Sequence, residues 1–198
     1  MDDDFILIVT DTSPLLTLAL ADNLDALLRP KIPITIPDAV YVEATRVHGA
    51  PGASTIVQWI NEHLEQVRIV PTEIGVDQQR RIEEGRPVRG LGEQAAIEAL
   101  ERFLQSNEKA RALLLFEDTD VEKRRAVVDE RVSLISTGDF LRELEAAGLI
   151  QSTDFVLERA AEQGRNIERQ RRERGRDDAR DRLRRQLQRD RQDRGFDR

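Results

Sequence analysis

The chain has 198 residues, of which 39% are hydrophobic and 35% are charged, and this length fits one domain with an appendage. It contains no cysteine, which excludes disulfides, thiolate nucleophiles and zinc or iron–sulfur sites built on cysteine. The net charge of −7 does not exclude a nucleic-acid substrate, because salt screens charges beyond about 8 Å and a local basic patch can still bind phosphate.

Strands and helices alternate along residues 1–163. In the first half we expect strands at 5–10, 34–36 and 67–70, with helices from Ser13 to about 28, from 37 to about 47 and at 54–64. In the second half we expect helices at 76–84, 93–105, near 121–130, near 139–147 and near 152–163, with strands at 112–116 and 132–135. Strands that alternate with helices indicate right-handed crossovers and therefore an α/β fold with a central parallel sheet.

Residues 164–198 differ in composition from the rest of the chain. From 165 onward there are 14 Arg and 8 acidic residues, a net +6, which leaves a net −13 for residues 1–164. The apolar residues of this segment, Ile167, Ala179, Leu183, Leu187 and Phe196, are too few for the stripe that a core helix needs. We therefore expect a domain at 1–163 and a low-complexity tail that is disordered or a solvated helix, with an RNA-contacting or partner-binding arm as the alternative.

Several sequence signatures are missing. The N-terminus, with Asp2 to Asp4, has the wrong charge for a secretory signal, and every apolar run is shorter than the roughly 18 residues of a membrane span. P-loop, GxGxxG and GxSxG motifs are missing too. His48 and His63 are isolated, and Trp59 and Phe103 have the spacing of core residues. We expect a cytoplasmic protein that does not act at a membrane.

Two acidic residues follow apolar runs that have the pattern of buried strands. Asp11 comes two residues after the run at 5–9, and Asp118 comes two residues after the run at 113–116. In parallel sheets the functional groups gather at the carboxyl ends of the strands, where loops and helix N-termini converge. Asp11 and Asp118 are therefore expected at one edge of the sheet.

Two further acids fall on the apolar faces of predicted helices. Glu43 is spaced with Ile36, Val40 and Val47, and Glu93 is spaced with Ala96, Leu100 and Phe103. Glu98 and Glu101 lie on the other side of their helix and are expected to be exposed. Because an unpaired buried carboxylate is costly, both inward acids need a partner.

Each of the four acids also has a structural explanation. Asp11 could cap a helix or hold a turn, Glu43 could pair with Arg46, Glu93 could be favoured by the helix dipole, and Asp118 could be an ordinary loop residue. If all four converge, however, they need a cation, because two carboxylates 4 Å apart repel by about 4 kcal/mol. Oxygen ligands without Cys or suitably placed His select Mg²⁺ or Mn²⁺. A water on such an ion can attack a phosphodiester, so these acids predict a nuclease.

Four segments carry these acids: VTDTSPLL at 9–16, IPDAVYVEA at 36–44, GLGEQAAI at 90–97 and LLLFED at 113–118. In this order and spacing they resemble PIN-domain ribonucleases, close to the VapC-like toxins of bacterial toxin–antitoxin pairs, over about residues 5–150. The resemblance places the family's acids on Asp11, Glu43, Glu93 and Asp118, and a hydroxyl that helps to position the first acid on Ser13. It implies a three-layer α/β/α sandwich, one or two Mg²⁺ or Mn²⁺ ions and single-stranded RNA as substrate. An antitoxin protein and a second copy of the chain are the partners it implies.

The last segment departs from the family pattern. Residues 117–120 offer three carboxylates, and the basic residues that often follow the family's acid closely come only at 123–125. Asp118 is the expected fourth acid, with Asp120 and Glu117 as alternates.

We hypothesise a metal-dependent endoribonuclease in which Asp11, Glu93 and Asp118 hold the cation, while Glu43 holds a water or a second metal. One rival is a PIN-like regulatory module of little or no activity, which binds nucleic acid or a partner through its acidic pocket or Arg-rich tail. Another is a Mg²⁺-dependent phosphatase of a different doubly wound fold, in which Asp11 is the nucleophile and a phosphoenzyme forms.

Overall fold

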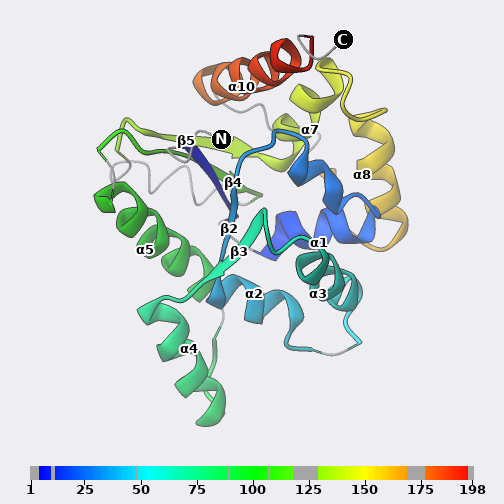
Figure 1. The fold of residues 1–198 in the computed structure, drawn as a ribbon. Helices are drawn as coiled ribbons and strands as arrows, with labels where there is room; N and C mark the ends of the chain where they lie inside the picture. The colour runs from blue at the N-terminus through cyan, green and yellow to red at the C-terminus, as the bar shows by residue number, and fades with distance from the viewer. Residues whose placement is uncertain are drawn as a thin grey trace.

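Within the described residues, five parallel strands form one sheet in the computed structural model (Figure 1). The structure describes residues 5–9, 12–47, 49–88, 90–106, 108–117, 129–168 and 177–195. The strands are β1 (Phe5–Val9), β2 (Ile34–Pro37), β3 (Val67–Val70), β4 (Arg111–Phe116) and β5 (Val132–Ser136), in the order β3-β2-β1-β4-β5. Every pairing is parallel, which confirms the expected type of sheet.

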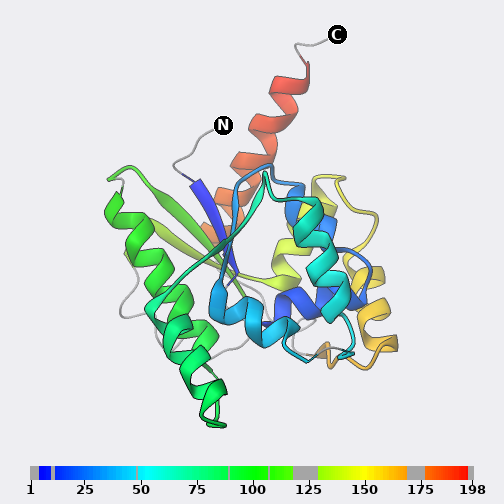
Figure 2. The ribbon, with the colours of Figure 1, turned by 60° about the horizontal axis from the view of Figure 1, so that its bottom comes forward.

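Helices cover both faces of the sheet, as Figure 2 shows. One face carries α5 (Leu91–Ser106), on which α4 (Glu73–Glu83) packs; the other carries α1 (Thr12–Leu20) and α7 (Thr137–Ala146). Helices α3 (Ala53–Glu62) and α8 (Thr153–Glu162) pack on α1, and α2 (Asp38–Thr45) contacts α1, α3 and α5. The three-layer α/β/α sandwich is therefore confirmed. No helix in the described part of the chain is long and apolar enough to cross a membrane.

Strand β4, which lies next to the central strand β1, is buried on both sides. Leu113 and Leu115 belong to the larger core, which lies under α1 and α7, whereas Ala112 and Leu114 face the smaller core under α5. A strand between two helical layers has no polar face, which is why its sequence is a continuous apolar run. Trp59 lies in the larger core, as the sequence predicted.

The strand order places β1 and β4 side by side where the chain changes its direction across the sheet. After β1 the chain continues to β2 and β3, whereas after β4 it continues to β5 on the opposite side. Val9 pairs with Leu115, so the carboxyl ends of the two strands are neighbours. In parallel sheets such a switch point opens the crevice in which ligands bind.

The helix predicted from Ser13 to about residue 28 is divided into two elements. Helix α1 ends at Leu20, and the 3-10 helix η1 (Leu24–Leu28) follows it. Asp22, with a φ of 54°, lies between them in a conformation that a continuing α-helix does not allow. Helix α1 also begins before Ser13, so Ser13 lies in the first turn and is not the residue that precedes it. The helix predicted near 121–130 lies almost entirely outside the described residues.

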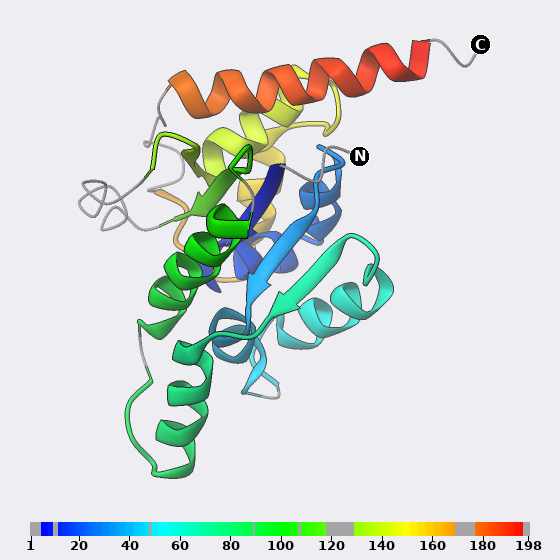
Figure 3. The same cartoon turned by 60° about the vertical axis from the view of Figure 1, so that its left-hand side comes forward.

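The Arg-rich segment contains a helix that packs on the domain. Helix α10 (Asp177–Gly195) contacts α7 and β5 and lies across the N-terminal end of the sheet (Figure 3). Ile167, Ala179, Leu183 and Leu187 are buried in the larger core. The prediction that these four residues cannot pack is therefore wrong, because three of them recur every four residues and form a narrow stripe that α7 and β5 cover. Phe196 lies outside the described residues.

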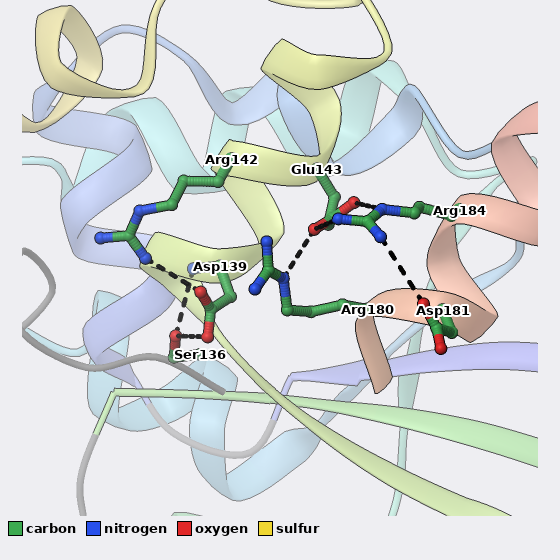
Figure 4. A network of polar contacts seen from close by, with 7 residues as sticks. All are labelled: Ser136, Asp139, Arg142, Glu143, Arg180, Asp181 and Arg184. Atoms are coloured by element: carbon green, nitrogen blue, oxygen red, sulfur yellow. Dashed lines mark hydrogen bonds and ion pairs between the residues drawn. The ribbon is translucent and has the colours of Figure 1, made fainter. Parts of the chain in front are cut away.

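Charge pairing joins α10 to α7, as Figure 4 shows. The carboxylate of Glu143 on α7 is 1% exposed and accepts hydrogen bonds from Arg180 Nε at 2.7 Å and from Arg184 Nε at 2.6 Å. Arg184 donates a further bond through Nη2 at 3.1 Å, and its Nη1 lies 3.6 Å from Asp181. The buried charge of Glu143 is thus matched by two guanidinium groups from the Arg-rich segment.

Candidate functional site

Glu43 lies on α2 and contacts the N-terminus of α5. Its Oε1 accepts a hydrogen bond from the backbone N–H of Gly92 at 3.3 Å and lies 3.5 Å from Gln78 Nε2. The half-buried position raises the pKa of the Glu43 carboxyl above its ordinary value of 4.5. The N–H groups of Gly92 and Leu91 act in the opposite direction, followed by the charge of Arg46 and by Gln78. The expected pairing with Arg46 is thus a minor influence beside the helix N-terminus.

Gly92 allows α2 and α5 to approach each other this closely. A Cβ at this position would lie 3.1 Å from Val40 Cγ2 and 3.2 Å from Glu43 Oε2, so any larger residue would push against both side chains. Val47, which the sequence places on the same apolar face as Glu43, lies beyond the end of α2 and is 59% exposed. Glu43 therefore faces the first turn of α5 and not an apolar stripe.

Glu93 follows Gly92 in the first turn of α5 and is partly buried. Its predicted neighbours Ala96 and Leu100 are buried, as their spacing indicated. The prediction that Glu98 is exposed is wrong, because only 20% of its side chain is exposed. Glu98 accepts hydrogen bonds from the N–H groups of Glu73 and Ile74, at 2.8 and 3.1 Å, and therefore caps α4.

Glu117, directly after β4, is the centre of a buried cluster that the sequence did not predict. Only 5% of the residue is exposed, and its Oε2 accepts hydrogen bonds from Thr17 Oγ1 at 3.2 Å and from Arg165 Nη2 at 3.0 Å. Arg165 also donates to Thr17 Oγ1 at 3.1 Å and to the carbonyl oxygen of Ser13 at 3.3 Å. The available signal was Thr17, a polar residue in the apolar helix α1; no pattern indicated that Arg165 would reach it.

Asp11, Asp118 and Asp120 lie outside the described residues, and so does His48. Asp11 and Asp118 follow strands whose ends are adjacent, since Val9 at the end of β1 pairs with Leu115 in β4. The described part of the chain contains no group of three or more His, Asp or Glu residues that could hold a metal ion. The four-acid site therefore stays a prediction, of which the structure describes Glu43 and Glu93.

His63 has surroundings typical of a structural residue. Its Nδ1 lies 2.8 Å from the carbonyl oxygen of Trp59, and the two rings are 5.4 Å apart between centroids. The Trp59 indole donates to Asp25 Oδ1 at 2.9 Å.

A family model described as a PIN domain matches residues 7–179, which include β2 to β5, the last three residues of β1 and the start of α10. The chain belongs to the PIN-domain family. PIN domains are generally nucleases, that is hydrolases, and typically use divalent metal ions. Searches of curated proteins and of solved structures gave no match for this PIN domain.

Proposed function

We propose that this PIN domain is a metal-dependent endoribonuclease that hydrolyses phosphodiester bonds of single-stranded RNA. The supporting observation is the position of Glu43, held against the first turn of α5, the turn that also carries Glu93. The two strands that precede Asp11 and Asp118 end next to each other at the switch point of the sheet. Four acids from separate parts of the chain would thus share one edge of the sheet.

A purely carboxylate donor set fits Mg²⁺ or Mn²⁺, which prefer oxygen ligands. We assign the ion to Asp11, Glu93 and Asp118, and a water or a second ion to Glu43. When bound, the metal supplies an activated water and stabilises the departing oxyanion. Glu117 is already engaged by Arg165 and Thr17, which favours the next acid, Asp118, as the fourth acid.

We also propose that the protein acts in the cytoplasm as the toxin of a toxin–antitoxin pair. The rival function, a regulatory module of little or no activity, is supported by the net −13 of residues 1–164, which repels RNA. Purification of the protein with and without the product of the neighbouring gene distinguishes a toxin, which the second protein inhibits, from an unregulated nuclease.

The direct test is cleavage of a labelled single-stranded RNA in Mg²⁺ or Mn²⁺, with EDTA as the metal control. We compare the parent protein with Asp11→Asn, Glu43→Gln and Glu101→Gln; Glu101 is exposed on α5 and serves as a matched carboxylate-to-amide control. We expect cleavage by the parent and by Glu101→Gln, and its loss in EDTA and in the other two variants. Cleavage by Glu43→Gln and Asp11→Asn at the parent rate would contradict the proposed site.

A measurement independent of activity tests the metal. Mg²⁺ should raise the melting temperature of the parent, because an ion that binds only the folded state stabilises it. Mg²⁺ should leave the melting temperature of Asp11→Asn unchanged. Equal shifts for both proteins would remove Asp11 from the metal site.

A further inference from the structure

A groove of about 580 Å³ lies at the end of the sheet opposite the candidate site. Its lining residues come from α10, from the first residues of β1 and β4 and from the residue that precedes β5. Figure 3 shows α10 crossing this end of the sheet. We call it the basic groove, because its lining includes Lys109, Arg111, Arg131, Arg182, Arg185 and Arg189. Glu108 is the one acidic residue among the described lining residues.

Helix α10 supplies three of these arginines through one of its faces. Arg182, Arg185 and Arg189 are three and four residues apart, a spacing that places them on the same side of a helix. Leu183 and its partners in the buried stripe occupy another side, and Arg180, which pairs with Glu143, occupies a third (Figure 4). The contacts that dock α10 therefore leave the row of Arg182, Arg185 and Arg189 to line the groove.

One cation of the basic groove, Arg131, is engaged by other groups of the protein. Arg131 pairs with Asp129 at 2.6 Å and donates through Nη1 to the carbonyl oxygen of Leu104 at 3.1 Å. The hydrogen bonds from Arg131 lower the pKa of the Asp129 carboxyl to about 2. Both groups are therefore ionised at neutral pH, and the pair adds no net charge to the groove.

Arg111, Arg182 and Arg185 keep the groove positive beside Glu108, the one acidic residue among its described lining residues. Arg111 and Arg185 are exposed and have no carboxylate partner among the described residues. Arg182 donates through Nη2 to the carbonyl oxygen of Glu130 at 2.9 Å, while its Nη1 is buried without a hydrogen-bond partner in the described part of the chain. Guanidinium groups in such a cluster match the oxygens of phosphate esters in charge and geometry.

We propose that the basic groove binds the phosphate backbone of RNA at a distance from the cleavage site. This inference rests on the proposed function, which supplies the RNA. RNA is favoured over an acidic polypeptide because the groove is also lined by Phe5, an aromatic residue that is half-buried against the larger core and whose exposed part a base can contact. The groove also provides the local attraction that an acidic body, with a net −13 over residues 1–164, needs to hold RNA.

The two sites are separated by the length of the sheet. β4, which runs from the basic groove to the candidate site, spans Arg111–Phe116, or about 20 Å at 3.3 Å per residue. At 3.4 Å per stacked nucleotide, an RNA needs more than about six nucleotides to reach both sites. Long and short substrates therefore separate binding in the groove from cleavage.

The test compares Arg111→Gln/Arg185→Gln with Arg29→Gln/Arg68→Gln in the full chain. Both double variants lose two positive charges, but exposed Arg29 and Arg68 lie outside the basic groove. Binding of fluorescent RNAs of about four and about twenty nucleotides is measured by anisotropy over a range of salt concentrations, because each phosphate contact adds about 0.7 to the salt slope for single strands. Circular dichroism melting checks that both variants are folded.

We expect the groove variant to bind the long RNA about tenfold more weakly at 0.15 M salt, with a slope smaller by about 1.4. In cleavage assays its KM for the long RNA should rise while its kcat stays unchanged. Its KM and kcat for cleavage of the short RNA should equal those of the parent. Equal weakening by the control variant, or no weakening by the groove variant, overturns the inference, as does an acidic polypeptide that binds the groove when RNA does not. Groove-dependent binding without any cleavage would instead refute the proposed function alone.

Discussion

The docking of α10 can be tested at its buried ion pair. Glu143→Gln keeps the shape of the side chain but removes the charge that three hydrogen bonds from Arg180 and Arg184 share. It also turns an amide NH₂ donor toward guanidinium donors. Hydrogen bonds to charged groups contribute about 1.5–3 kcal/mol each. The arginine side chains are 26% and 48% exposed and regain water when the pair is lost, so we expect a total loss of about 2–3 kcal/mol.

The assay is native-state amide hydrogen exchange of α10, combined with urea unfolding of the whole domain. Exchange at Leu183 and Leu187 should become about 30- to 150-fold faster in Glu143→Gln, since 1.4 kcal/mol corresponds to a factor of ten. Asp181→Asn removes a carboxylate from the same network, but Asp181 is 58% exposed and lies 3.6 Å from Arg184. We expect it to cost about 0–1 kcal/mol. Equal effects of the two variants would refute the inference that the buried charge of Glu143 holds α10.

Three further variants test the site and the core. Because the pKa of Glu43 is raised, the parent loses stability as pH rises from 4.5 through that higher pKa; Glu43→Gln should lack this loss, melt higher than the parent near pH 7 and melt equally near pH 4. The same pH dependence of the melting temperature in the parent and in Glu43→Gln would contradict this expectation. RNA cleavage by Glu43→Gln should fall about 100-fold or more. Gly92→Ala should destabilise the domain by about 1–3 kcal/mol in urea unfolding, because the added methyl group would press against Val40. A stabilised variant would show that α5 can shift to make room for the methyl group. Leu183→Ala should cost about 2–5 kcal/mol if α10 belongs to the folding unit, whereas an unchanged midpoint would mean that α10 unfolds separately.

The sheet could be predicted from the sequence because burial on both faces demands continuous apolar strands. The run at 113–116 and the helices between successive strands were sufficient to indicate a parallel sheet. Helix ends were harder to predict, because they depend on local conformations such as the positive φ of Asp22.

Contacts between distant charged residues could not be predicted. Helix α10 has only a narrow apolar stripe, and its partner Glu143 lies 37 residues before Arg180. Arg165 reaches Glu117 across a similar separation, 48 residues. Charged residues without a visible partner resemble a solvated surface, which is why the segment after residue 163 was predicted to be unpacked. Glu43, by contrast, could be singled out from its spacing with Val40, which is buried, although Val47 lies beyond the end of α2 and is exposed.

The position of β4 beside the central strand β1 also affects how the chain must fold during synthesis. Phe5 pairs with Arg111, 106 positions later. At roughly 5–20 residues per second, the ribosome needs roughly 5–20 s to make the residues between them. During that time one edge of the apolar strand β1 has no neighbour and is a template for association with other chains. Nascent chains that stop before Arg111 should therefore aggregate, whereas those that include β4 can close the centre of the sheet.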